Sequence, residues 1–323
     1  MSPAELAQTS NSAIYASMLA LTLAMVFFAF SYAAGRRKIS VATSAEVTQS
    51  EVIESEGGAA VITRTEVVDP IIPGRRTANI AMSLTWLGTA FLLAGVVLRG
   101  VWAGRVPWGN MYEFSITAAL GILVVFLGFS LKRDVRWLGI FIVIPALLTL
   151  GLAVTVLYTE AAQLVPALKS YWLVIHVSAA IICSGAFTLA AAVSALALLR
   201  GHAERKAAGV EVTGLTARMP SQVRLQIMAN RVIAFTFPLW TFAVIAGAIW
   251  AENAWGRYWG WDPKETWAFI TWVVFAAYLH ARSTVGWRGN RASWIAIIGW
   301  STFLANYFGV NLFINSLHSY SGV

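Results

Sequence analysis

Charged residues are scarce in this chain. Of its 323 residues, 12% are Asp, Glu, Lys or Arg and 58% are hydrophobic, whereas a soluble domain carries roughly 25% charged residues. The mean hydropathy is +0.68. This shortage excludes a soluble globular fold, because the long uncharged segments must lie in lipid. The sequence therefore predicts an integral membrane protein.

Cysteine is almost absent as well. The single residue, Cys183, lies inside an apolar run, so no disulfide can form within the chain. We interpret Cys183 as a small apolar filler and a poor candidate for thiol chemistry. The net charge is +8, but no basic face of a soluble domain, the usual footprint of nucleic-acid binding, is visible. We therefore expect contact with the lipid bilayer and none with nucleic acid.

Eight apolar runs are long enough to cross a bilayer as helices. They predict an all-α polytopic membrane helix bundle of about eight transmembrane helices. The runs are 12–34, 79–98, 114–131, 137–158, 172–199, 232–251, 266–281 and 293–314.

Basic residues give this bundle an orientation. With the N-terminus outside, 18 of the 23 Lys and Arg residues fall in inner loops, as the positive-inside rule requires. Both termini then lie on the outer side. We divide the chain into a first anchor (1–34), a mobile cytoplasmic loop (35–78) and a seven-helix membrane domain (79–323) whose outer loop spans 252–265.

Tryptophan is concentrated on the predicted outer side. Eight of the 15 tryptophans fall there, more than an aromatic belt at both interfaces explains. The densest stretch is Trp255-Gly-Arg-Tyr-Trp-Gly-Trp-Asp-Pro-Lys-Glu-Thr266. Its four rings offer stacking faces, and its glycines let the backbone approach a ligand closely. Such a surface is suited to something flat and apolar.

Two acids in this stretch have a structural interpretation that needs no ligand. Asp262-Pro-Lys-Glu265 has the pattern of a helix N-cap, a proline at the first helical position and a glutamate at the third, as in a capping box. We expect this structural role to start the seventh span.

Four histidines occur in the chain. His176 and His318 fall at the same outer level as the tryptophan loop, His202 in a cytoplasmic loop, and His280 about 21 Å deeper than Thr266 along the seventh span. A lone membrane histidine is most simply a helix-end residue bonded to a carbonyl. A pair at one level can instead give two axial ligands to a six-coordinate haem.

These residues resemble a known family. The tryptophan-rich segment, the string Pro107-Trp-Gly-Asn-Met-Tyr-Glu-Phe114 and the positions of His176, His280 and His318 are similar to those of the CcsA (ResC) family, haem-handling membrane proteins of the two-protein system for cytochrome c synthesis that carry a tryptophan-rich "WWD" signature. The resemblance covers most of the chain from about Asn79.

The resemblance implies a site and a reaction. His176 and His318 correspond to the axial ligands of haem b, held as a bound substrate. His280 corresponds to a ligand of a transmembrane haem whose second ligand comes from a CcsB (ResB)-type partner. The vinyl groups are joined to the Cys-x-x-Cys-His thiols of apocytochrome c on the extracytoplasmic face of the plasma membrane, with thioredoxin-like proteins as thiol reductants. The other residues expected to bind haem are Trp255, Arg257, Tyr258, Trp259, Trp261 and Asp262.

Several alternatives stay open at this stage. A haem export or delivery chaperone of the same signature family is the nearest, although such proteins typically have six spans. A b-type respiratory cytochrome would need a histidine facing His280 at matched depth, and none exists in the chain. A transporter or structural subunit accounts for the tryptophans but not for the histidine levels. Whether the chain acts as an enzyme, as a haem lyase subunit, also stays open.

Overall fold

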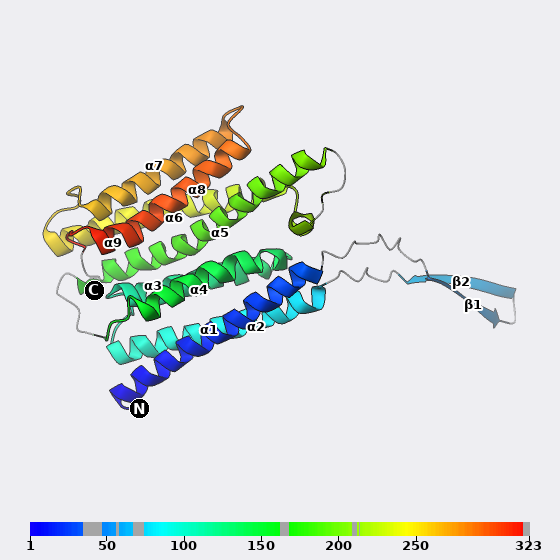
Figure 1. Ribbon diagram of the computed structural model, residues 1–323, viewed down its shortest axis with the longest axis horizontal. Coiled ribbons are helices and arrows are strands. Elements are labelled where there is room, and N and C mark those ends of the chain that lie inside the picture. Colours follow the sequence, from blue (N-terminus) through cyan, green and yellow to red (C-terminus); the bar gives the residue numbers. More distant parts are fainter. Residues whose placement is uncertain are drawn as a thin grey trace.

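The chain folds into long antiparallel helices in a computed structural model (Figure 1). The structure describes residues 1–34, 47–55, 58–66, 74–161, 168–208, 212 and 214–318. The long helices are α1 (Pro3–Ala34), α2 (Arg75–Ala103), α3 (Met111–Ser130), α4 (Gly139–Thr155), α5 (Tyr171–Ala207), α6 (Gln222–Trp255), α7 (Pro263–Ser283) and α8 (Asn290–Leu304).

The last helix continues past its regular part. A π-helical turn at Ala305–Gly309 and the short α9 (Val310–Phe313) extend α8 without a break. Two short 3-10 segments, Arg136–Leu138 and Gly214–Arg218, precede α4 and α6. All eight predicted spans therefore coincide with helices.

Seven of the helices in the described residues are long and apolar enough to cross a membrane, with α8 to α9 counted as one. The chain is a multi-pass membrane protein. The eighth helix, α7, falls outside this group because Lys264, Glu265, His280 and several Trp, Thr and Tyr residues lower its hydropathy. It lies between α6 and α8 in contact with both, and it runs beside α8 along its length (Figure 1).

The segment expected to be a mobile loop contains regular structure. Strands β1 (Val47–Ser55) and β2 (Gly58–Glu66) form an antiparallel pair, with Val47 opposite Glu66 and Ser55 opposite Gly58. Their Val, Ile and Thr content favours strands, which the sequence analysis did not predict. The rest of the predicted loop up to residue 73 lies outside the described residues.

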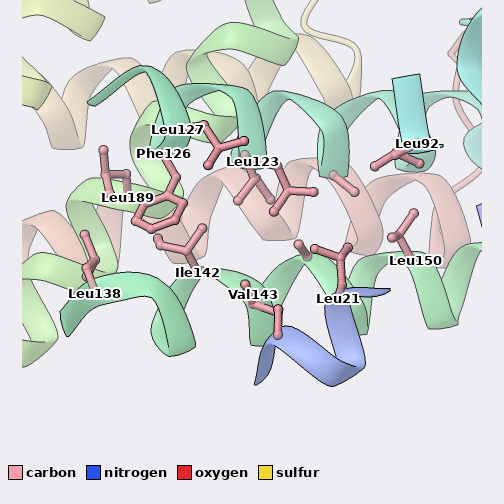
Figure 2. Close-up of a cluster of buried hydrophobic side chains, with 14 of the residues drawn as sticks. Leu21, Leu92, Leu123, Phe126, Leu127, Leu138, Ile142, Val143, Leu150 and Leu189 are labelled. Atoms are coloured by element: carbon pink, nitrogen blue, oxygen red, sulfur yellow. The ribbon is translucent and has the colours of Figure 1, made fainter. Parts of the chain in front are cut away.

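Helix α5 is the centre of the bundle. On one side it meets α3 and on the other α6 and α8, while α1 packs along α2. The first apolar cluster includes residues of α1, α2, α3, α4 and α5, and Figure 2 shows Phe126, Ile142 and Leu189 close together within it, with Leu21 and Leu92 further along the helices. The second joins α5 to α6, α7 and α8. There the ring of Phe187 stacks on that of Phe275 with centroids 3.9 Å apart.

Both described ends of the chain lie at the same end of the bundle (Figure 1). The connections between α2 and α3 and between α6 and α7, together with residues 314–318, also lie there. Helix α6 carries Pro238 in its interior, so one backbone hydrogen bond is missing midway along it. The fold thus places at one end of the bundle the loops that the sequence analysis assigned to the outer side of the membrane.

Candidate functional site

A cavity lies at this end of the bundle. It contains about 1210 Å³ of empty space, its open mouth included, and both His176 and His318 line it. Most of its wall is aromatic or aliphatic, as is usual for sites that bind large apolar ligands. Representative wall residues are Trp108, Phe114, Leu173, Trp240, Trp259 and Phe303.

His176 is held by helix α6. Its Nδ1 lies 2.7 Å from the carbonyl oxygen of Ala243, and because a carbonyl only accepts, Nδ1 carries the proton and Nε2 keeps a free lone pair. The imidazole is parallel to the ring of Trp250, with centroids 6.3 Å apart. A Cβ on Gly247 would come within 2.8 Å of the imidazole. Glycine at that position therefore makes room for the histidine.

His318 is held by the start of helix α7. Its Nδ1 lies 2.8 Å from Asp262 Oδ2, and the backbone N–H of Leu317 donates to Asp262 Oδ1 at 3.0 Å. The imidazole packs edge-on against Trp255 and Trp250, with centroids 4.7 and 5.4 Å away. Burial and the nearby Lys264 lower the pKa of His318 to about 4, although Asp262 raises it. The ring is therefore neutral at pH 7, the form that binds metals.

Asp262 has two functions at once. The predicted capping box is confirmed: Asp262 caps α7, and the side chain of Glu265 reaches back to the N-cap backbone. Burial alone would raise the pKa of Asp262, but hydrogen bonds from Leu317 and His318 outweigh it and the pKa lies below its ordinary value. The carboxylate that starts the helix thus also orients a histidine.

The tryptophan-rich loop is folded around Glu265. This carboxylate accepts the backbone N–H groups of Gly260 (2.8 Å) and Asp262 (3.0 Å) and lies 3.4 Å from Arg257 Nη1. Trp261 has a φ of +57°, a left-handed conformation that non-glycine residues rarely adopt. Such strained positions cluster at functional sites.

The loop residues that were predicted to bind haem do not all line the cavity. Tyr258 and Trp259 line the cavity, and Trp255 reaches it indirectly, through its contacts with His318 and Trp250. Trp261 is 65% exposed and packs on Trp259 and Phe269. The guanidinium of Arg257 folds back over Gly260, within 1.6 Å of where a Cβ there would lie.

The loop between α2 and α3, at the same end of the bundle, is likewise folded around a glutamate. Glu113 accepts the N–H of Gly109 at 2.8 Å and pairs with Arg105 (2.6 Å) and with Arg99 (3.1 Å), while Asn110 caps α3. Glu113 and Arg99 are fully buried. In both loops the glutamate follows an arginine by eight residues and the N-cap by three. The loop presents Trp108, Gly109 and Asn110 to the cavity.

A polar strip crosses the wall formed by α8 and α9. Lys264 Nζ lies 2.5 Å from Asn311 Oδ1, Asn311 donates to the carbonyl of Tyr307, and Tyr307 bonds Ser115 at 2.6 Å. The sequence analysis missed the amide partner of Lys264. It also missed Trp240, Gly247 and Trp250, because nothing in an apolar helix marks the face that turns toward a cavity.

His280 does not belong to this cavity. It is exposed near the far end of α7, and only its carbonyl is used, by the turn at Ser283 and Thr284. No group of three or more His, Cys, Asp or Glu side chains in the described part of the chain could hold a bare metal ion. Residues 319–323 lie outside the described part.

Comparisons with known proteins show to which family the chain belongs. The profile of the Cytochrome C assembly protein family matches residues 108–318, the range from Trp108 of the first loop to His318. A cytochrome c biogenesis protein CcsA of Guillardia theta is 37% identical over 239 residues, which cover 69% of this chain and 79% of that protein. The chain belongs to the CcsA family of cytochrome c assembly proteins. The resemblance predicted from the sequence is confirmed, and the chain acts in cytochrome c biogenesis.

Other CcsA relatives are similarly close. The CcsA proteins of Synechococcus elongatus and Microcystis aeruginosa are 35% and 34% identical, over 74% and 78% of this chain and 87% and 88% of their own lengths. Among solved structures, the cytochrome c heme lyase CcmF has a similar fold, with a TM-score of 0.60 and 15% identity over 95% of this chain. The chain spans about half of that lyase, 47% of its length.

Proposed function

We propose that this CcsA-family chain binds haem b as a substrate between His176 and His318 and presents it for attachment to apocytochrome c. One observation carries the proposal: both imidazoles line one apolar cavity, and each donates its Nδ1–H to a protein acceptor. Metal-binding histidines are typically oriented by such a second hydrogen bond, which leaves Nε2 for the metal.

The aromatic wall supplies most of the remaining binding energy. A porphyrin is flat and apolar, and the wall residues Trp108, Trp250, Trp259 and Phe114 offer faces and edges that suit it. Two strong-field imidazoles make the iron six-coordinate, which leaves no position for oxygen. The site thereby protects the bound haem until it is used.

The reaction itself needs no nucleophile from this chain. Each apocytochrome thiol adds across a vinyl group, so that sulfur bonds to the carbon next to the ring and hydrogen goes to the terminal carbon. Cys183 is fully buried and does not line the cavity. The contribution of the chain is position and orientation of the vinyl groups.

The proposal includes partners and a location. The positive-inside distribution favours a plasma-membrane protein with the cavity on the extracytoplasmic face, where apocytochrome c and thiol-reducing thioredoxin-like proteins would meet it. His280 is exposed on the bundle surface, a position from which it could share a transmembrane haem with a ligand of a CcsB-type membrane protein. In this arrangement the pair acts together as the haem lyase.

The test is the spectrum of the purified complex. With the partner co-expressed, the wild-type chain should show a six-coordinate low-spin haem. His176→Ala and His318→Ala should each abolish or weaken that spectrum, and added imidazole should restore part of it by filling the vacated ligand position.

His202 supplies a matched control. It is exposed on the same helix as His176, 26 residues or about 39 Å further along, so His202→Ala should leave the spectrum unchanged. If both cavity variants keep full haem and full cytochrome c maturation, the assignment of the ligands is wrong.

A further inference from the structure

Two residues that line the cavity each have a buried polar atom without a hydrogen-bond partner. The atoms are Nε1 of Trp240, a residue 3% exposed, and Oδ1 of Asn306, a residue 7% exposed. Among the buried side-chain atoms of the described residues that lack a partner, these two belong to residues that line the cavity. One is a donor and the other an acceptor.

The two residues lie toward the inner end of the cavity and are related through Phe303, which also lines it. Trp240 is ten residues before Trp250 on α6, about 15 Å deeper, and its ring contacts Phe303 with centroids 5.6 Å apart. Asn306 follows Phe303 by three residues, which is one helical turn toward the mouth. It lies in the π-turn, and π-turns are frequent at functional sites.

The neighbouring polar groups are already satisfied. Lys264 bonds Asn311, Asn311 bonds the carbonyl of Tyr307, and the Tyr307 hydroxyl bonds Ser115 and the carbonyl of Met111. A buried polar group without a partner is costly, more so where lipid excludes water. The free donor and acceptor at the inner end therefore mark a place for a polar group of a ligand.

We propose that Trp240 and Asn306 bind a carboxyl group of the substrate, a propionate side chain of the haem. The proposal rests on the proposed function. A carboxylic acid matches the pair in its neutral form: its carbonyl accepts from Trp240 Nε1–H and its hydroxyl donates to Asn306 Oδ1. No charge then has to be buried at this depth.

This contact would fix which edge of the porphyrin faces outward. Propionates and vinyls occupy opposite edges of protoporphyrin. With a propionate at Trp240 and Asn306, the vinyl edge points to the mouth, where Trp108 and Tyr258 line the wall. Tyr258 is 61% exposed, so this is the part of the cavity that thiols of another protein can reach. The inner pair thus determines the orientation that the reaction requires.

The experiment compares two ligands on the full-length chain in detergent. Haem and haem dimethyl ester, which lacks free carboxyl groups, are titrated into the wild type, Trp240→Phe and Asn306→Ala, and the Soret band reports affinity. Each variant should weaken haem binding about tenfold, the value of one well-placed hydrogen bond. Asn306→Ala should leave binding of the ester unchanged, because the ester has no hydroxyl to donate, whereas Trp240→Phe should weaken both ligands, because the ester keeps its carbonyl. Asn306→Ser replaces Asn306→Ala if the latter does not fold.

Trp300→Phe is the matched control. Trp300 donates its Nε1–H to Thr188 at 3.1 Å and does not line the cavity, so this variant should bind both ligands as the wild type does. If Asn306→Ala weakens haem and ester equally, the acid hydroxyl has no part in binding and the proposal is overturned, as it is if neither variant affects haem binding. If the wild type binds haem without a six-coordinate spectrum, the proposed function itself fails.

Discussion

The two imidazoles of the cavity are fixed by acceptors of different charge. His176 donates to the neutral carbonyl of Ala243, whereas His318 donates to the carboxylate of Asp262. A carboxylate partner makes a histidine a more basic ligand. At the residue scale the two proposed ligands are therefore unequal, and His318 would be the stronger donor to iron.

Asp262→Asn tests this inequality. Asparagine caps helices as well as aspartate does, so the start of α7 should persist while the charge behind His318 is lost. Haem affinity should fall about 10- to 100-fold, and the reduction potential of the haem should rise because the ligand is less basic. Haem titration and redox potentiometry measure both. Asn110→Asp, which changes the other N-cap, is the control, and an unchanged potential in Asp262→Asn would contradict the argument.

Gly247→Ala tests the packing behind the other ligand. The new Cβ would lie 2.8 Å from the imidazole of His176, so the ring must move and its bond to Ala243 must weaken. We expect at least a tenfold loss of low-spin haem at fixed haem concentration, measured by the Soret and α bands. Gly128→Ala on α3 has no atom within 4 Å of the new methyl group and should have no effect. Full haem loading of Gly247→Ala would refute a tight fit here.

At the scale of elements, each loop beside the cavity depends on one buried glutamate. Glu113→Ala would leave the fully buried Arg99 without its carboxylate, and breaking a buried pair costs about 3–5 kcal/mol. The variant should unfold at a clearly lower temperature in detergent. Asp134→Ala removes the carboxylate of an exposed pair with Arg136, and such pairs contribute roughly 0–1 kcal/mol. Equal melting temperatures for the two variants would show that the Glu113 cluster is unimportant.

The helices themselves were predictable because long apolar runs enter lipid, and even α7, whose polar residues lower its hydropathy, contains such a run. Their ends were not, since a helix can continue into water without an apolar signal. Helix α5 runs eight residues past the predicted end at Leu199, and α6 starts at Gln222 instead of residue 232. His202 consequently lies on a helix and not in a loop. The β-hairpin was missed for the opposite reason, as its strands lack the apolar runs that were sought.

The residue types of the candidate site could be predicted from the sequence, but their hydrogen-bond partners could not. Histidine and tryptophan stand out in an apolar chain, and the structure brings His176, His318, Trp259 and Tyr258 to one cavity; their roles toward haem stay predictions. The partners of these residues could not be foreseen. The carbonyl of Ala243 is like any other in the sequence, and the bond between Asp262 and His318 joins residues 56 positions apart.

For the whole molecule, the orientation in the membrane is the decisive question. In a Cys183→Ala background, a cysteine at Tyr258, beside the cavity, and one at Val285, 89% exposed at the opposite end, should react from opposite sides. A membrane-impermeant maleimide added to intact cells should label the first and leave the second unlabelled until the cells are opened. Labelling of both, or of Val285→Cys alone, would overturn the placement of the cavity outside the cell.

The double use of Asp262 has a thermodynamic consequence. Because one carboxylate both begins α7 and holds the tail through Leu317 and His318, fraying of the first helical turn and release of the tail are coupled equilibria. Coupling between binding events is reciprocal. Binding of a ligand to His318 must therefore stabilise the first turn of α7, and the coupling free energy is the same in the other direction. A change that destabilises the first turn must weaken ligand binding at His318 by that amount.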